Sequence, residues 1–508
     1  LKKEIFKEIK KIQENGITEE QLSLAKSIIE RETHYARESV SNIANEIGYT
    51  MIVAGNINFY KNYIENIKKV TLKDINKAAA KYLTEDKAAI SIILPENQQC
   101  EKEIAYDKKE SLPDAKLITQ NSQTQKYIFE NGTTLLLTPN EVNDIIAISI
   151  FAKGGEFIEN VAGTGKLTAA LMLKDTKNYT AAELANELDK YGIKINPISR
   201  PDAFEINVLT TKSEYNRALE LLNEVVNNAI FDEKELTKIK KERLNAIKKN
   251  RDRAISRTIE EYNTLIYQGS VYSNSTKILE HTYPKINRSD LTEYYDKIFA
   301  PNNLVISING NADKDKTIYE ITRIFTNRNQ LDFNYNTKKI PQTNSARTSV
   351  INDKNTQTDW ILLGWQTDGL SNLKDYATLN VINSLFGSGM SSRLFRNLRE
   401  KEGLAYQLGS TYNHNLLKGN FAVYIGTNPE TLDYSKKKLL EEINSLKTEL
   451  VSKTELQEAK DKLLGNFILS QETNLEKAST VGWFETSGRG YDFAKQYTEL
   501  INSVTAED

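Results

Sequence analysis

The chain has 508 residues, a length that allows about three domains with separate hydrophobic cores. Its 67 lysine and arginine residues nearly balance 69 aspartate and glutamate residues, so no excess charge favours a nucleic acid or an anionic membrane as partner. The single cysteine, Cys100, excludes an intrachain disulfide, and three widely separated histidines argue against a histidine-rich metal site. Because no apolar run approaches the roughly 18 residues that span a bilayer, we expect no membrane segment in this chain.

Neither end of the sequence has the pattern of a natural protein terminus. Leu1 lies inside a helical pattern, and the sequence stops at Asp508 without a tail. We therefore expect a soluble fragment whose localisation, cytoplasmic or periplasmic, depends on an N-terminus that the fragment lacks.

The first helical segment recurs at the end of the chain. Residues 17–22 (ITEEQL) match residues 451–456 (VSKTEL), an offset of 434 residues. The same offset relates Gly48 to Gly482, Phe59 to Phe493, Tyr63 to Tyr497, Ile67 to Ile501 and Asp74 to Asp508. A match that keeps register over about 60 residues indicates an internal repeat.

A third copy begins at residues 231–236 (FDEKEL), 214 residues after the first. Its later part, residues 286–308, matches residues 70–92 at an offset near 216. The repeating unit is thus about 215 to 220 residues long, which is too long for a solenoid and predicts tandem domains of one fold.

Strand patterns open the second and third units. Apolar segments at residues 127–129 and 133–137 flank Asn131-Gly132, which predicts a hairpin with a type I′ turn. Further strands are expected at residues 88–93, 145–152, 304–308, 360–363 and 421–425. Since each unit also contains amphipathic helices, we predict α+β repeats, each a two-layer domain with an antiparallel sheet and helices packed on one face.

Residues 386–406 (FGSGMSSRLFRNLREKEGLAY) carry a specific resemblance. A glycine-containing turn, a helix from about Ser391, a Leu-Arg pair, Gly403 as helix C-cap and a strand bearing tyrosine resemble the Arg/Tyr motif of the pitrilysin/insulinase family of zinc metallopeptidases, the H-x-x-E-H inverzincins. The strand at residues 420–430 supports the match. The resemblance covers nearly the whole chain and implies half of a clam-shaped chamber that encloses peptides.

The resemblance also gives the units their places among the four domains of that family. The expected parts are residues 1–97, the C-terminal part of the second domain; 98–125, a linker; 126–332, the third domain; 333–355, a linker; and 356–508, the fourth domain, truncated at its end.

In that family the first domain carries H-x-x-E-H, with a further glutamate ligand about 75 to 80 residues later. The two histidines and the later glutamate hold zinc, and the glutamate of the motif activates water. The corresponding segment here has Lys166, Ala169 and Ala170 at the motif positions, and Lys248-Lys249 where the later glutamate is expected. The resemblance therefore implies no metal or cofactor in this chain, with Zn²⁺ in the missing N-terminal domain.

The resemblance assigns Arg399 and Tyr406 to the scissile bond, because a guanidinium and a phenol donate hydrogen bonds to a peptide carbonyl and its oxyanion. A structural interpretation stands beside it. An arginine near a helix C-terminus often interacts with the helix dipole or a neighbour such as Glu402. A tyrosine that alternates with Leu404 and Leu408 is often part of a core.

These observations predict the substrate-clamping, non-catalytic half of a zinc metalloendopeptidase, inactive alone. Its partners would be a peptide or unfolded polypeptide substrate and the H-x-x-E-H half, on the same polypeptide. The alternative is a catalytically dead family member that serves in protein binding or complex assembly. The basic stretch at residues 238–253 is interrupted by acidic side chains and is interpreted as a solvated helix face, so no nucleic acid is expected.

Overall fold

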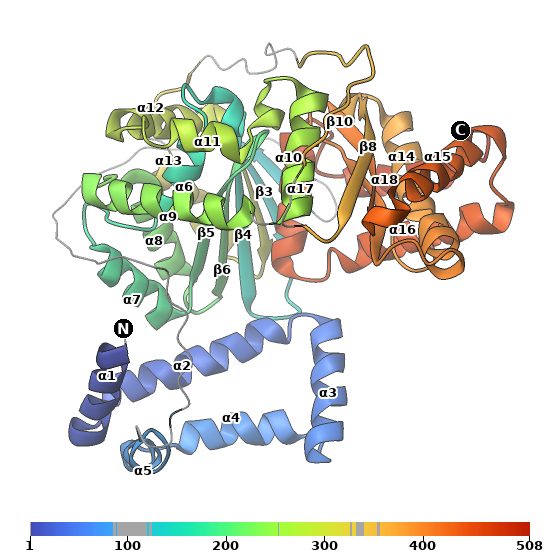
Figure 1. Ribbon diagram of the computed structural model, residues 1–508. Helices are drawn as coiled ribbons and strands as arrows, with labels where there is room; N and C mark the ends of the chain where they lie inside the picture. Colours follow the sequence, from blue (N-terminus) through green and yellow to red (C-terminus); the bar gives the residue numbers. More distant parts are fainter. Residues whose placement is uncertain are drawn as a thin grey trace.

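The computed structural model describes residues 2–84, 88, 119–120, 124–251, 253–325, 328–331, 340–352 and 356–508. These residues form a helical N-terminal arm, a seven-stranded sheet with helices, and a three-stranded sheet with helices (Figure 1). The predicted α+β architecture is present. The strand expected at residues 88–93 and the linker at 98–125 lie almost entirely outside the described residues.

The N-terminal arm comprises α1 (Lys2–Asn15), α2 (Glu19–Ala36), α3 (Val40–Ala54), α4 (Phe59–Lys69) and α5 (Leu72–Tyr82). Helix α2 attaches the arm to α7 (Ala181–Tyr191) and to the strand that follows. The Tyr35 hydroxyl donates to the carbonyl oxygen of Gly192 at 2.7 Å, and Glu32 pairs with Lys194 at 2.9 Å. Polar contacts therefore hold the arm against the rest of the chain.

The seven-stranded sheet has the order β1-β2-β3-β7-β4-β6-β5. Its strands are β1 (Thr119–Gln120), β2 (Gln125–Ile128), β3 (Thr134–Pro139), β4 (Ile145–Lys153), β5 (Lys194–Ser199), β6 (Ala203–Thr211) and β7 (Leu304–Gly310). All neighbours are antiparallel except β3 and β7, so the sheet is mixed rather than wholly antiparallel as predicted. The long helical segment before β7 lets that strand run in the same direction as β3.

The predicted hairpin joins β2 and β3, but its turn is not type I′. A type I′ turn needs positive φ at both central residues, and among the described non-glycine residues only Phe231 and Gln268 have positive φ. Instead, the Gly132 amide donates to the Phe129 carbonyl at 2.9 Å, and Gly132 itself has φ +87°. Asn131 uses its side chain, whose oxygen accepts from the Thr133 amide at 3.1 Å.

Helices cover one face of this sheet. They are α6 (Thr164–Leu171), α8 (Tyr215–Asn227), α9 (Glu233–Arg251), α11 (Thr276–Thr282), α12 (Arg288–Ile298) and α13 (Lys314–Phe325), together with α7. Ile146, Ile148 and Ile150 of β4 point into the core beneath them, whereas Phe151 belongs to a second buried cluster on the opposite face. Both faces of β4 are therefore buried.

The three-stranded antiparallel sheet has the order β8-β10-β9, with β8 (Asp359–Thr367), β9 (Gln407–Asn413) and β10 (Gly419–Thr427). Its core contains residues of α14 (Leu373–Phe386), α15 (Leu432–Thr448), α16 (Lys453–Leu469) and α18 (Phe493–Ser503). None of the helices in the described part of the chain is long and apolar enough to cross a bilayer.

Each sheet is covered in part by one helix from the stretch of chain that forms the other sheet, an arrangement called here the exchange of α10 and α17. Helix α10 (Ala254–Tyr267), which precedes β7 in the chain, packs on β8, and its Tyr262 hydroxyl donates to the Asn420 side chain at 3.2 Å. Helix α17 (Asn474–Thr486), which follows β10, packs on β4 and β7, where Trp483 lies 6.2 Å from Phe151 between ring centroids. Both helices lie between the two sheets in Figure 1. The prediction placed helices on one face of each sheet. In the structure α17 also covers the second face of the seven-stranded sheet.

Candidate functional site

The segment that carries the Arg/Tyr resemblance forms a π-helix, Phe395–Lys401, between α14 and β9. Gly403 follows the helix end, where its left-handed φ of +65° suits a glycine. The Leu404 amide then donates to the Leu398 carbonyl at 2.9 Å, which closes the helix end. The predicted helix and its glycine cap are present, but the helix is of the π type that often occurs at functional sites.

Ion pairs and apolar packing fix the orientation of this π-helix. Arg393 donates two hydrogen bonds to Glu455 of α16, at 2.6 and 2.8 Å, and these bonds lower the pKa of that carboxyl. Asn397 donates to Glu442 of α15 at 3.0 Å, and Leu398 is buried. With one face anchored to two helices, the position of Arg399 on the π-helix is well defined.

Arg399 and Tyr406 lie together. The guanidinium carbon of Arg399 is 5.3 Å from the Tyr406 ring centroid and 4.7 Å from the Phe395 ring centroid, distances suited to cation–π contacts. Among the described residues Arg399 has no ion-pair partner, and Glu402 pairs instead with Lys438 of α15 at 3.2 Å. The interpretation that Arg399 pairs with Glu402 is therefore wrong.

Tyr406 is a surface residue, with 80% of its area exposed. Tyr406 immediately precedes β9 and is exposed, although Leu404, two residues earlier, is buried. A core role for this tyrosine is therefore excluded. The pair presents an accessible phenol and a planar set of guanidinium donors on the surface of the three-stranded part.

The three positions of the degenerate zinc motif lie on α6, on the other sheet. Lys166 pairs with the buried Glu156, while Ala169 and Ala170 pack in the core. A cation that already has a carboxylate partner and two methyl groups provide no ligand for zinc. In the described part of the chain no three His, Cys, Asp or Glu side chains gather where they could hold a metal ion.

Glu159, a second carboxyl group near Glu156, fixes the backbone at the start of α6. The sequence did not predict this role. The two carboxyl oxygens of Glu159 accept from the Gly163 and Gly165 amides at 2.7 and 2.6 Å. Burial, aided by the neighbouring Glu156, raises the pKa of Glu159 to about 8. Gly165 is required here, since a Cβ would lie 2.5 Å from the Ser199 hydroxyl oxygen.

The raised pKa makes stability depend on pH. Glu159 binds a proton in the folded protein up to pH about 8, but only up to its usual 4.5 when unfolded, so its contribution is complete below pH 4.5 and is lost as pH rises through 8. We expect the stability advantage of the wild type over Glu159→Gln to shrink by more than about 1 kcal/mol between pH 5 and 8.5 in urea unfolding. Parallel pH profiles for the two proteins would contradict this role.

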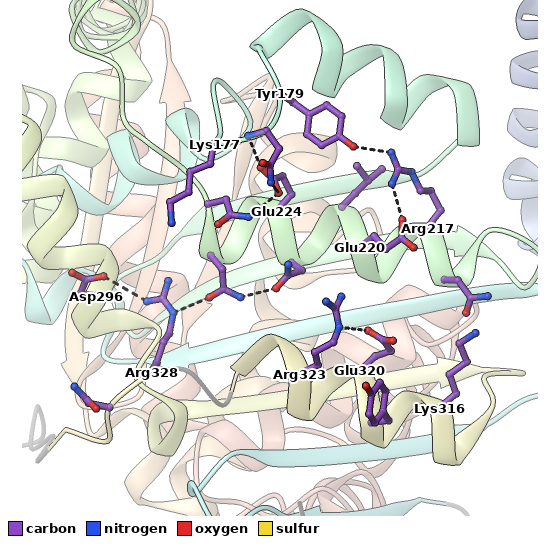
Figure 2. Close-up of a pocket in the computed structure, with 18 of the residues that line it drawn as sticks. Lys177, Tyr179, Arg217, Glu220, Glu224, Asp296, Lys316, Glu320, Arg323 and Arg328 are labelled. Atoms are coloured by element: carbon purple, nitrogen blue, oxygen red, sulfur yellow. Dashed lines mark hydrogen bonds and ion pairs between the residues drawn. The ribbon is translucent and has the colours of Figure 1, made fainter. Parts of the chain in front are cut away.

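A polar groove of about 1820 Å³ lies elsewhere, over α8, α12 and α13. Figure 2 shows acidic partners for the arginines of this groove: Arg217 bonds to Glu220, and Arg323 to Glu320 at 2.7 Å. Arg328 lies 3.8 Å from Asp296. Because these charges neutralise one another, the groove offers no concentrated field for a charged ligand, and it includes none of the predicted site residues.

Two family models match adjacent stretches of the chain. "Insulinase (Peptidase family M16)" matches residues 135–276, and "Peptidase M16 inactive domain" matches residues 285–463, which includes the π-helix and Tyr406. The chain belongs to the insulinase family of peptidases. The recognition made from residues 386–406 is thereby confirmed.

The similar proteins include both proteins described as proteases and one described as a non-peptidase. An uncharacterized zinc protease of Rickettsia felis is 27% identical over 381 residues, 75% of this chain and 91% of that protein. A Helicobacter pylori protein described as a non-peptidase homolog is 23% identical over 70% of this chain and 83% of its own length. The periplasmic protease PqqL of Escherichia coli has the same fold, with a TM-score of 0.67 at 13% identity, over 98% of this chain and 60% of PqqL.

Proposed function

We propose that this chain is the substrate-clamping half of a zinc metalloendopeptidase, in which Arg399 and Tyr406 donate hydrogen bonds to the carbonyl of the scissile peptide bond. The observation that carries the proposal is the exposed phenol of Tyr406 beside an arginine without an ion-pair partner among the described residues. The zinc chemistry would come from an H-x-x-E-H domain upstream on the same polypeptide.

The donors match the charge that develops during peptide hydrolysis. Attack on the carbonyl carbon moves negative charge onto the carbonyl oxygen, and preorganised donors stabilise that charge more strongly than they stabilise the ground state. The Arg393–Glu455 and Asn397–Glu442 contacts hold the π-helix in place, so reorganisation during the reaction would be small.

An edge strand beside the pair supports a peptide or unfolded polypeptide as the substrate. β9 begins directly after Tyr406 and is an edge of the β8-β10-β9 sheet. An extended chain that adds to such an edge gains backbone hydrogen bonds without a requirement for sequence. Its carbonyl groups would then lie near the Tyr406 hydroxyl.

A second function, protein binding or complex assembly without catalysis, is favoured by one observation. One relative, the Helicobacter pylori protein, is described as a non-peptidase homolog. The sequence upstream of this chain separates the two functions. H-x-x-E-H followed by a glutamate about 75 to 80 residues later supports the peptidase, and a degenerate motif there supports the assembly module.

The chain of 508 residues, purified alone, should contain zinc well below one equivalent and should cleave no peptide, because Lys166, Ala169 and Ala170 supply neither ligands nor a base. Metal analysis by mass spectrometry and a digest of fluorogenic peptides measure both properties. One equivalent of zinc together with turnover would overturn the assignment of these three positions.

A further inference from the structure

The polar groove over α8, α12 and α13 has no part in the proposed peptide clamp. Its volume of about 1820 Å³ exceeds the roughly 300–1,000 Å³ of a typical small-molecule site. The walls are formed by the three helices, the turn at residues 177–179 and the segment 328–331. A groove of this size has room for an oligomer of several linked units.

Polar side chains make up most of the lining. The aliphatic exceptions are Leu221, which is buried, and Leu331. Carboxamides are frequent, and those that line the groove are Asn178, Asn216, Asn223, Asn227, Asn228 and Asn329. A ligand that relied on apolar contacts would find few of them here, so the groove suits a molecule that is polar along its whole length.

The charges of the lining favour an uncharged ligand. Six basic and five acidic side chains line the groove, and each arginine lies within ion-pair distance of a carboxylate. Lys177 and Lys316 have no ion-pair partner among the described residues, but both are exposed and lie far apart in Figure 2. Two separated, hydrated ammonium groups do not create the concentrated positive field that would attract an anion.

Hydrogen bonds hold the carboxamides of α8 in place. Asn227 donates to the Asn223 side-chain oxygen at 2.9 Å and to the Ile324 carbonyl at 2.7 Å. The Asn227 side-chain oxygen in turn accepts from Arg328 at 3.1 Å. The amide nitrogen of Asn223 has no partner among the described residues. Because its orientation is already fixed, this group can donate to a ligand without a large loss of side-chain entropy.

A buried carboxylate orients the wall at residues 177–179. Glu224 accepts from the Asn178 side chain at 2.7 Å and from the Asn178 backbone amide at 3.1 Å. It also accepts from the Asn228 side chain at 2.8 Å. The fold therefore positions these two carboxamides as well, before any ligand arrives.

Tyr319 of α13 adds an aromatic ring to the polar lining, with 62% of its area exposed. One face of a sugar ring carries C–H groups that stack on an aromatic side chain, while its hydroxyls both donate and accept hydrogen bonds. Carboxamides also offer a donor and an acceptor each. An oligosaccharide thus matches the size, the neutrality and the polar lining of the groove together.

We propose that this groove binds a neutral oligosaccharide, with one sugar ring stacked on Tyr319 and hydroxyls that accept hydrogen bonds from Asn216 and Asn223. An extended polypeptide fits less well, because its side chains need pockets that the lining does not provide. The inference goes beyond the peptide clamp and does not depend on it, since the groove contains neither Arg399 nor Tyr406.

Isothermal titration calorimetry of the 508-residue chain tests the proposal with three uncharged probes: maltopentaose, cellopentaose and penta-N-acetylchitopentaose. We expect at least one of them to bind at one site per chain. Its affinity should change less than about threefold between about 50 and about 500 mM salt, because salt does not screen the contacts of a neutral ligand. The three probes differ in linkage and in the acetamido group, so their relative affinities identify the sugar chain that the groove accepts.

Two substitutions show whether the sugar occupies the groove. In Tyr319→Ala and in Asn216→Ala the affinity should fall at least about tenfold. Both side chains are exposed, so both variants should melt as the wild type does. The matched control is Tyr82→Ala, which should bind normally, since Tyr82 is also 62% exposed but belongs to α5 of the arm.

Failure of all three pentasaccharides to bind overturns the proposal. Equal affinity in the wild type and in both groove variants also overturns it, because the sugar would then bind elsewhere. An uncharged Gly-Ser repeat peptide is the competing probe. If the peptide binds and the groove variants lose that binding, the groove is a polypeptide site and the proposal is wrong. Peptide cleavage is not measured in these titrations, so none of their outcomes bears on the proposed clamp.

Discussion

In the zinc-bearing protein, Tyr406→Phe should lower kcat by about 10²- to 10³-fold, the usual effect of losing one donor to a developing oxyanion. The substitution removes only the hydroxyl. Because Tyr406 is exposed and the core beneath it is formed by residues such as Leu398 and Leu404, folding should be unchanged. Steady-state kinetics with a fluorogenic peptide and a thermal melt measure the two properties.

Arg399→Lys should be impaired for the same reason, since lysine keeps the charge but loses the planar set of donors. Matched controls come from the same surface. Arg396→Lys changes an arginine of the same π-helix that lies 4.0 Å from Glu455, and Tyr434→Phe changes a partly exposed tyrosine. Both controls should cleave normally. If the Tyr406 and Arg399 variants also fold and cleave at the wild-type rate, the proposed role of the pair is wrong.

Local signals in the sequence predicted the path of the backbone around this pair. The glycine turn after α14, a helix and the left-handed Gly403 follow from residue types at fixed spacing, and all three are present. The surroundings of the side chains were harder to predict. Glu402 pairs with Lys438 of α15, which is distant in sequence, and Tyr406 is exposed although its spacing from the buried Leu404 predicts the same face of a strand.

The exchange of α10 and α17 was not predictable from the same signals. We predicted helices on one face of the sheet only. The apolar run of β4 is typical of a strand buried on both faces, but periodicity does not say what covers each face. Small residues at positions 478, 482 and 486 show which side of α17 is packed, and that pattern is the same for either sheet. The partner is decided by tertiary contacts such as that between Trp483 and Phe151.

The exchange should make the two sheets unfold together, and Phe151→Ala tests this. Removal of a buried phenylalanine side chain costs about 3 to 5 kcal/mol, and Phe151 is buried against Gly482 and Trp483 of α17. Helix α10 also connects the two sheets, because its Tyr262 bonds to Asn420 of β10. Loss of the Phe151 side chain should therefore destabilise β10 as much as β4.

Hydrogen exchange of β4 and β10 at rising urea concentrations measures both strands in one experiment. A single transition, shifted equally for both in Phe151→Ala, is expected. Trp365→Ala, which removes an aromatic side chain of β8 that is partly exposed, is the control and should cost much less. Two separate transitions, or a cost below about 1 kcal/mol, would show that the exchanged helices do not couple the sheets. One cooperative transition would instead mean that the surface carrying Arg399 and Tyr406 derives part of its rigidity from the seven-stranded sheet.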